Sequence, residues 1–196
     1  EPAWALGKIR TVEAHAMLSR YLSTAPANAR SAPAVHEALL SIGRYTIRDD
    51  RAAVMRWTTS TDEEIRWRAT WALFRPRDPA AVPALLRLSE DPSASVRNWA
   101  IRALTAPQVD SAGVRAADVV ARLVRLATDP DRSVRTEAMR TLVSFSDTLA
   151  WSVASQGLNS PDSWISVSAG EGLGPQRHNA SMSAPPLAAG TRPGKT

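Results

Sequence analysis

Two stretches of the sequence, DPSASVRNWAIRAL at 91–104 and DPDRSVRTEAMRTL at 129–142, follow one pattern. Aligned without gaps, they place Val96 over Val134, Arg97 over Arg135, Ala100 over Ala138, and Leu104 over Leu142. The same frame fits STDEEIRWRATWAL at 60–73 and SPDSWISVSAGEGL at 160–173, while a weaker copy ends at Ile42 and a partial copy at Leu6. Because such internal repetition marks a chain of stacked units, the repeat decides the fold.

The last apolar column gives the length of one unit. Its positions 42, 73 and 104, and again 142 and 173, are 31 residues apart, whereas 36 residues separate 6 from 42 and 38 separate 104 from 142. Extra residues in a repeat belong between its helices. We therefore predict a loop at 106–116, APQVDSAGVRA, whose Pro, Gly and Asp favour turns.

Each copy predicts an α-helix with one apolar stripe. Val96, Ala100 and Leu104 are four residues apart, so they lie on one face of a helix, and the small Ala lets a neighbouring helix approach closely. Asp-Pro at 91–92 and at 129–130 predicts the starts of two of these helices. The reason is that Asp caps helix N-termini and Pro fits the first helical position.

A second amphipathic segment precedes each stripe. Its apolar residues correspond in two copies: Val82, Leu85, Leu86 and Leu88 match Val120, Leu123, Val124 and Leu126. Each unit is therefore predicted to be a pair of helices, and a lone pair cannot bury its apolar faces. We expect an all-α chain, a right-handed α-α superhelix of about five helix pairs over 1–174. Its units would end near 6, 42, 73, 104, 142 and 173, and the Pro-rich remainder at 175–196 is expected to be a disordered tail or linker.

These residues resemble a known family. A Pro-containing first helix, AAVPALLRL at 80–88, followed by D-P-x-x-x-V-R-x-x-A-x-x-A-L, is similar to HEAT repeats, particularly the short bacterial type found in phycobilin lyases. The resemblance covers residue 1 to about 174 and implies a solenoid that serves many roles. It also implies bonds between adjacent units, through Asp91, Arg97, Asp129 and Arg135. The last copy departs from the pattern, with Ser166 in the Arg column.

Arrays resembling this one are often joined to a prolyl isomerase domain of the cyclophilin type. The chain begins at Glu1 and has no evident polar cap at either end of the array. We therefore expect a fragment of a larger protein. One alternative that follows is the recognition arm of a prolyl isomerase or lyase.

Composition restricts the function classes. Lys and Arg number 24 against 19 Asp and Glu, for a net charge of +5, and all the basic residues except Lys8 and Lys195 are Arg. That balance permits nucleic-acid binding without requiring it. The absence of Cys excludes disulfides, thiolate metal sites and Cys nucleophiles. No apolar run approaches the roughly 20 residues that a membrane span needs.

Several motifs suggest chemistry but lack its context. AGTRPGKT at 189–196 fits a loose phosphate-loop pattern, yet no strand precedes it. The three histidines, His15, His36 and His178, have no metal-ligand spacing, and the single pair His36-Glu37 is fewer than the several pairs of the HEAT-type deoxyhypusine hydroxylases. We therefore predict no enzyme activity, no metal and no cofactor.

Tryptophan and arginine supply the candidate site. Three tryptophans lie off the apolar stripes, on the side of the second helices that faces the concave surface in HEAT solenoids, and two arginines occupy the column of Trp71. With a further arginine beside Trp67, they form a set that we predict to bind a partner, since Trp and Arg dominate interface hot spots. The six residues are Trp67, Arg68, Trp71, Trp99, Arg102 and Arg140.

Three interpretations of this set stay open. It can bind a protein or peptide, it can bind a nucleic-acid backbone with bases stacked on the indoles, or Trp can shield the grooves between helices while Arg packs over it. We expect the first, a non-enzymatic scaffold that binds its partner on the concave face. The alternative from another class is a DNA-associated protein similar to the HEAT-like alkylpurine DNA glycosylases, for which Glu137 and Glu171 are the only acids in suitable columns.

Overall fold

The computed structural model describes residues 2–28 and 30–173, and every regular element in these ranges is helical. The bounds of the α-helices are α1 Pro2–Ile9, α2 Val12–Thr24, α3 Ala32–Gly43, α4 Arg51–Met55, α5 Glu63–Phe74, α6 Val82–Leu88, α7 Ala94–Ile101, α8 Ala106–Ser111, α9 Ala116–Leu126, α10 Arg132–Leu142, α11 Thr148–Gly157 and α12 Ser163–Leu173. Two 3-10 turns, η1 Arg48–Asp50 and η2 Pro79–Ala81, lead into α4 and α6. The predicted all-α class is confirmed.

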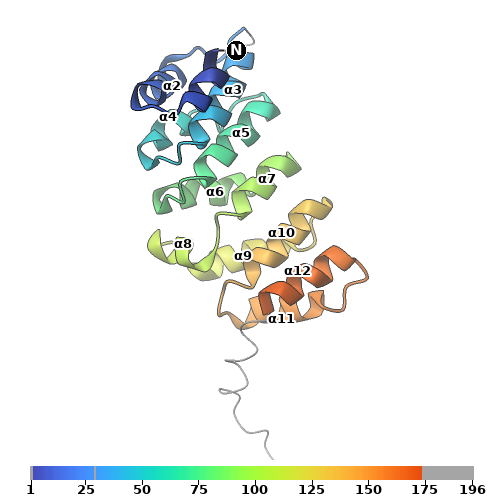
Figure 1. The fold of residues 1–196 in the computed structure, drawn as a ribbon. Coiled ribbons are helices and arrows are strands. Elements are labelled where there is room, and N and C mark those ends of the chain that lie inside the picture. Colours follow the sequence, from blue (N-terminus) through green and yellow to red (C-terminus); the bar gives the residue numbers. More distant parts are fainter. Residues whose placement is uncertain (1, 29, 174–196) are drawn as a thin grey trace, which may run out of the picture.

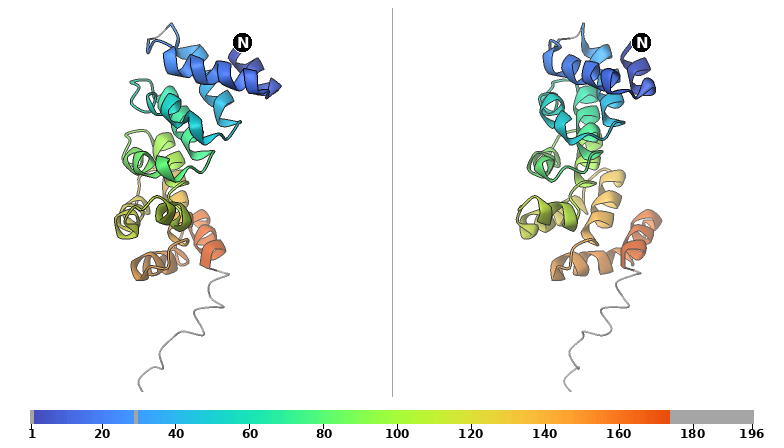
Figure 2. Two further views of the ribbon diagram at one scale, coloured as in Figure 1. Left: turned by 90° about the vertical axis from the view of Figure 1, so that its left-hand side faces the viewer. Right: turned by 60° about the vertical axis from the view of Figure 1, so that its left-hand side comes forward.

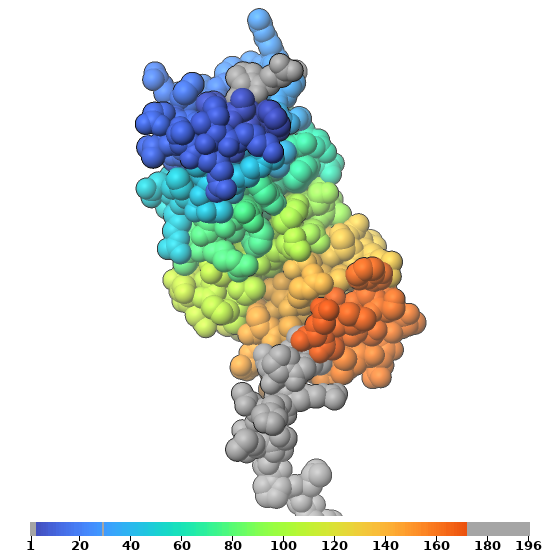
Figure 3. All heavy atoms as spheres, in the orientation of Figure 1, coloured from blue at the N-terminus to red at the C-terminus, as the bar shows by residue number. Residues whose placement is uncertain are grey.

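The helices form a stack of pairs (Figure 1). The first helices of the pairs are α2, α4, α6, α9 and α11, and the second helices are α3, α5, α7, α10 and α12. Each second helix contacts the next one along the chain, and α1 contacts α3 in the same way. The two layers are visible when the molecule is turned (Figure 2), and the repeats follow one another as successive bands from the N-terminal end (Figure 3). This arrangement confirms the predicted solenoid of about five helix pairs.

The apolar stripes of the second helices form the centre of the core, as predicted. These stripe residues are buried in three copies: Ile65, Ala69, Leu73, Val96, Ala100, Leu104, Val134, Ala138 and Leu142. In the weaker copy Ala34 is exposed and Val35 is buried in its place. Val35 lies three residues before Ala38, which keeps it on the same helix face.

The core is divided near the last repeat. One continuous cluster of buried side chains extends from Leu18 to Ala150, while Met139, Ala154, Ile165 and Ala169 form a separate small cluster that holds α12. A repeat array gains stability from each interface between neighbours. We therefore expect α12 to be held less firmly than the central helices.

Glycine permits close helix contacts at the start of the array. A side chain at Gly7 would clash with Ser41, whose Cβ would lie 2.6 Å away, and one at Gly43 would clash with the Trp71 ring. The absent Cβ atoms allow α1 to approach α3 and α3 to approach α5. Because Gly43 has no side chain, the ring of Trp71, one of the predicted site residues, can pack against it.

The predicted helix starts at the Asp-Pro pairs are wrong. The N-cap of α7 is Ser93 and that of α10 is Asp131, so Asp91 and Asp129 lie two residues earlier, outside the helices. Their carboxylates instead accept the backbone N–H groups of Ser93 and Asp131 at 2.8 and 2.9 Å. Asp commonly makes such a bond two residues ahead, and here it forms the turn before the helix.

The predicted loop at 106–116 is also wrong in part. Residues Ala106–Ser111 form α8, a six-residue helix, and the turn follows at Gly113 with φ of 66°. Pro107 lies in the first turn of α8, where its missing N–H is tolerated. Proline therefore begins a helix here, although it is also a common residue of loops.

Candidate partner-binding surface

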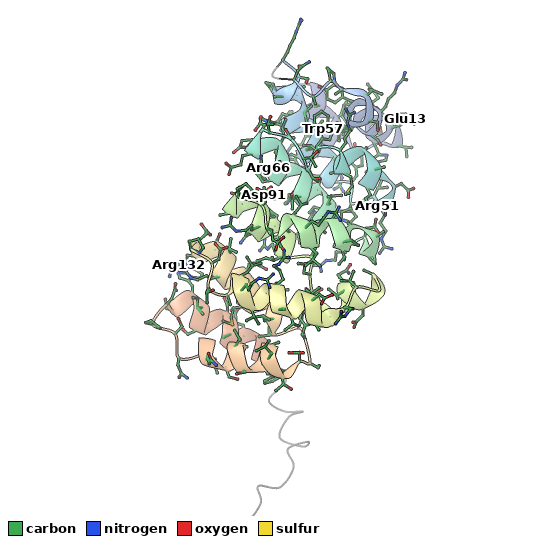
Figure 4. All side chains as sticks on the ribbon, turned by 180° about the vertical axis from the view of Figure 1, so that it is seen from behind. Glu13, Arg51, Trp57, Arg66, Asp91 and Arg132 are labelled. Atoms are coloured by element: carbon green, nitrogen blue, oxygen red, sulfur yellow. The ribbon has the colours of Figure 1, made fainter. Side chains whose placement is uncertain are left out.

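The central repeats are joined by bidentate arginine–aspartate pairs. Arg66 donates to Asp91 from Nε at 2.9 Å and from Nη2 at 3.1 Å. Arg97 donates to Asp129 in the same manner, at 2.9 and 2.8 Å. Figure 4 shows Arg66 and Asp91 side by side on adjacent repeats. The bond to Asp91 raises the pKa of the Arg66 guanidinium above its ordinary value.

All three arginines of this column also support the loop before their own helix. Arg66 Nη1 donates to the carbonyls of Ser60 and Thr61 at 3.0 and 3.3 Å. Arg97 Nη1 donates to the carbonyls of Asp91 and Pro92, both at 2.9 Å, and Arg135 Nη1 donates to those of Asp129 and Pro130 at 2.8 and 3.0 Å. The four residues of the implied inter-repeat set are therefore engaged within the array.

The last junction is built differently. Ser160 stands in the column of Asp91, so no turn aspartate is present there, and Asp162 receives the bonds instead. Arg132 donates to Asp162 from Nε and Nη2 at 3.1 and 2.9 Å, whereas Arg135 lies 3.8 Å away. The Arg132 bond lowers the pKa of the Asp162 carboxyl. Alignment of the copies reveals the departure at Ser166, but it does not predict that Asp162 pairs with Arg132 at this junction.

The predicted tryptophans are half-buried rather than open. Trp71 and Trp99 meet edge to face with ring centroids 6.5 Å apart, and Phe74 lies 5.9 Å from Trp99. Guanidiniums cover the rings: Arg75 lies over Trp71 at 5.6 Å, and Arg102 lies over Trp99 at 4.7 Å. The cluster packs α5 against α7, so it contributes to the fold as well as to the surface.

Trp67 stands apart from that cluster. Arg68 covers its ring at 4.4 Å and also bonds Glu64, which lowers the pKa of the Glu64 carboxyl. The structure thus divides the six predicted residues between two places. Trp67 lies with Arg68, while Trp71, Trp99, Arg102 and Arg140 form a connected row, because Arg102 lies over Trp99 and shares Glu137 with Arg140.

Arg102 and Arg140 converge on one buried carboxylate. Glu137 Oε2 lies 3.2 Å from Arg102 Nε and 2.9 Å from Arg140 Nη1. Beside this triad is a groove of about 570 Å³, lined by Asn98, Arg102, Asp131, Arg132, Ser133, Thr136, Glu137, Arg140 and Trp164. The groove lies over the second helices α7, α10 and α12.

Trp164 is a groove residue that the predicted set lacks. Its side chain is 60% exposed, and Arg132 lies 5.8 Å from its ring centroid. A signal was present, because Trp164 falls in a column that holds Ser95 and Ser133 in two other copies. An indole in a column of small polar residues marks a surface position rather than a core position.

Two histidines, His15 and His36, contact neighbouring repeats. His15 Nε2 lies 2.7 Å from Asp50, and His36 Nε2 lies 3.1 Å from Asp62, the N-cap of α5. Among residues 2–28 and 30–173, no cluster of three His, Asp or Glu side chains could hold a metal ion. In the same ranges no helix has the length and apolarity to cross a membrane. His178, the tail at 175–196 and the motif at 189–196 lie outside the described residues.

Comparison with known proteins supports the repeat. Residues 31–105 match the family model for HEAT repeats, which confirms the resemblance over that range. No curated protein matches the chain. A crystallised engineered protein is 22% identical at a TM-score of 0.63, over 83% of this chain and 48% of its own, so this chain spans about half the length of that protein.

Two further solved structures have the same architecture. A designed armadillo repeat protein in complex with the peptide (KR)4 is 16% identical at a TM-score of 0.66, over 86% of this chain and 84% of its own. The YibA protein of Escherichia coli is 21% identical at a TM-score of 0.64, over 90% and 68%. At these identities the likeness concerns the fold alone. Residues 2–28 and 30–173 form an all-helical repeat solenoid of the HEAT and armadillo type.

Proposed function

We propose that this chain is a non-enzymatic scaffold that binds a protein or peptide on its second-helix face, the row formed by α3, α5, α7, α10 and α12. The observation that carries the proposal is the groove over α7, α10 and α12, where an exposed Trp164 lies beside Arg102 and Arg140. Exposed aromatic and arginine side chains gathered at one groove are characteristic of protein interfaces. The designed armadillo protein binds a peptide on the same architecture, which supports a peptide-binding role here.

The proposal assigns different tasks to the predicted residues. Trp71 and Trp99 hold α5 against α7, so their main contribution is to the shape of the face. Arg102 and Arg140 line the groove and contact the partner together with Trp164. Of the residues predicted from the sequence, the proposal thus keeps Arg102 and Arg140 as partner contacts, and it adds Trp164.

The DNA-associated alternative has less support. Guanidiniums lie over the rings of Trp67, Trp71 and Trp99, so these faces do not offer bases an open stacking platform. Glu137, one of the two acids considered for glycosylase chemistry, is engaged by Arg102 and Arg140.

Capture of partners from lysate tests the choice of face. Trp164→Glu places a charge in the groove, and Leu149→Glu places the same charge at an exposed residue of the first helix α11. We expect partner proteins to be lost with the first variant and kept with the second, with or without nuclease. Equal capture by both variants would contradict the face assignment, and capture abolished by nuclease would favour the DNA-associated alternative.

A further inference from the structure

The carboxylates of the groove are already occupied by the protein. Asp131 caps α10 by accepting the N–H groups of Ser133 and Val134, at 2.8 and 3.1 Å. The side chain of Glu137 is only 10% exposed beneath Arg102 and Arg140. A partner entering the groove therefore meets few free negative groups.

The guanidiniums, in contrast, remain accessible. The side chains of Arg102, Arg140 and Arg132 are 35%, 45% and 54% exposed. A guanidinium carries five N–H donors, and of these Arg140 gives one to Glu137, while Arg102 forms an ion pair with the same carboxylate oxygen. Donors thus remain for a partner, and guanidinium groups match carboxylates in shape and charge.

An apolar contact lies next to these donors. The exposed ring of Trp164 borders the groove, and Val167, three residues further along α12, is 54% exposed. Residues three apart on a helix share a face, so the two side chains form a small apolar strip. The groove therefore combines anion recognition with a place for one apolar side chain.

We infer that the groove over α7, α10 and α12 binds an acidic peptide segment, with carboxylates on Arg102 and Arg140 and an apolar side chain on Trp164. The inference rests on the proposed function and specifies the chemistry of its partner. A peptide is favoured over nucleic acid because guanidiniums cover the rings of Trp67, Trp71 and Trp99, so the face offers no row of open rings on which successive bases could stack.

Glu137 has a defined role in this arrangement. It competes with an incoming carboxylate for Arg102 and Arg140, since both guanidiniums already bond it. Glu137→Gln removes that competing charge and retains a hydrogen-bonding oxygen. We expect this variant to bind an acidic peptide roughly threefold more tightly.

The probe is a short fluorescein-labelled peptide of Glu and Asp with one central Phe, titrated with the whole chain and followed by fluorescence anisotropy. A matched peptide of Lys and Arg with the same Phe and a labelled oligothymidylate serve as comparisons. We expect saturable binding of the acidic peptide that weakens with salt. Preference for the basic peptide or for the oligonucleotide would overturn the inference.

The variants locate the binding. Arg102→Gln/Arg140→Gln should weaken the acidic peptide by about tenfold, and Trp164→Ala by a similar factor. The control Arg87→Gln/Arg115→Gln removes the same charge from exposed residues elsewhere and should leave affinity unchanged. Circular dichroism checks folding, and because Trp164 is exposed its variant remains informative if the arginine pair destabilises the fold.

The two proposals can fail separately. If Trp164→Glu abolishes capture of partners while the acidic peptide does not bind, the second-helix face is retained and the acidic chemistry is rejected. If the acidic peptide binds equally to the chain and to Arg102→Gln/Arg140→Gln, attraction to the net positive charge explains it and the groove assignment is rejected.

Discussion

The junction between α7 and α10 differs from the junction between α10 and α12 although both use arginine and aspartate. At the first, Arg97 and Asp129 are 13% and 6% exposed, and the turn aspartate carries the pair. At the second, Arg132 and Asp162 are 54% and 21% exposed, and the aspartate before α12 carries the pair because Ser160 replaces the turn acid. The difference shows that the same residue types form a buried pair at one junction and an open pair at the other, and we propose that only the open arginines are available to a partner.

The largest effect on stability is expected at the buried junction. Arg97→Ala leaves Asp129 without its partner and removes donors from two loop carbonyls, so we expect a loss of about 3 kcal/mol in the free energy of unfolding. Urea titration measures it, with the exposed Arg115→Ala as control. A loss no greater than that of the control would contradict the structural role of this pair.

The aromatic cluster gives the next effect. Trp71→Ala removes the ring that packs on Gly43 and meets Trp99, and we expect a loss of about 2 kcal/mol because the indole is only half-buried. The same titration measures this loss. An unchanged unfolding midpoint would mean that Trp71 is a surface residue.

The exposed junction sharpens the comparison. Arg132→Ala breaks a pair that is more than half open to solvent at the arginine, so we expect its loss of stability to be less than about a third of that of Arg97→Ala. Thermal unfolding at low and high salt provides the measurement, and the difference from the unaltered chain should shrink as salt is added. A loss as large as that of Arg97→Ala would remove the distinction between the junctions.

The smallest effect concerns pH at the junction between α3 and α5. Burial opposes ionisation of Asp62, but bonds from His36 and from the N–H groups of Glu64 and Ile65 outweigh it and lower its pKa. A depressed pKa gives stability that is present above the unfolded value of 3.8 and lost as pH falls through the folded value.

Asp62→Asn tests that contribution, since Asn keeps the N-cap but does not titrate. Acid unfolding followed by circular dichroism should show a shallower loss of stability below about pH 4 in this variant. An identical acid profile would show that the ionised carboxylate does not contribute.

The sequence was sufficient to predict the helix pairs and their buried stripes, because four-residue spacing of Val, Ala and Leu is a local signal. It was insufficient for the helix starts, since Asp91 and Asp129 accept the N–H groups of Ser93 and Asp131 and form the turn before each helix instead of its N-cap. Only part of the candidate site could be predicted from the sequence. Column position placed Arg102 and Arg140 on the second helices, but the cover over Trp71 and the exposure of Trp164 depend on neighbouring helices.

The most direct test measures stability and affinity together for Trp71→Ala and Trp164→Ala, with urea titration and anisotropy of the acidic peptide on the same preparations. We predict that Trp71→Ala lowers the free energy of unfolding by about 2 kcal/mol, while Trp164→Ala weakens the peptide by about tenfold and leaves the unfolding midpoint in place. If Trp164→Ala unfolds the array, or if it leaves affinity unchanged while the folded Trp71→Ala loses it, the assignment of partner binding to the exposed groove is contradicted.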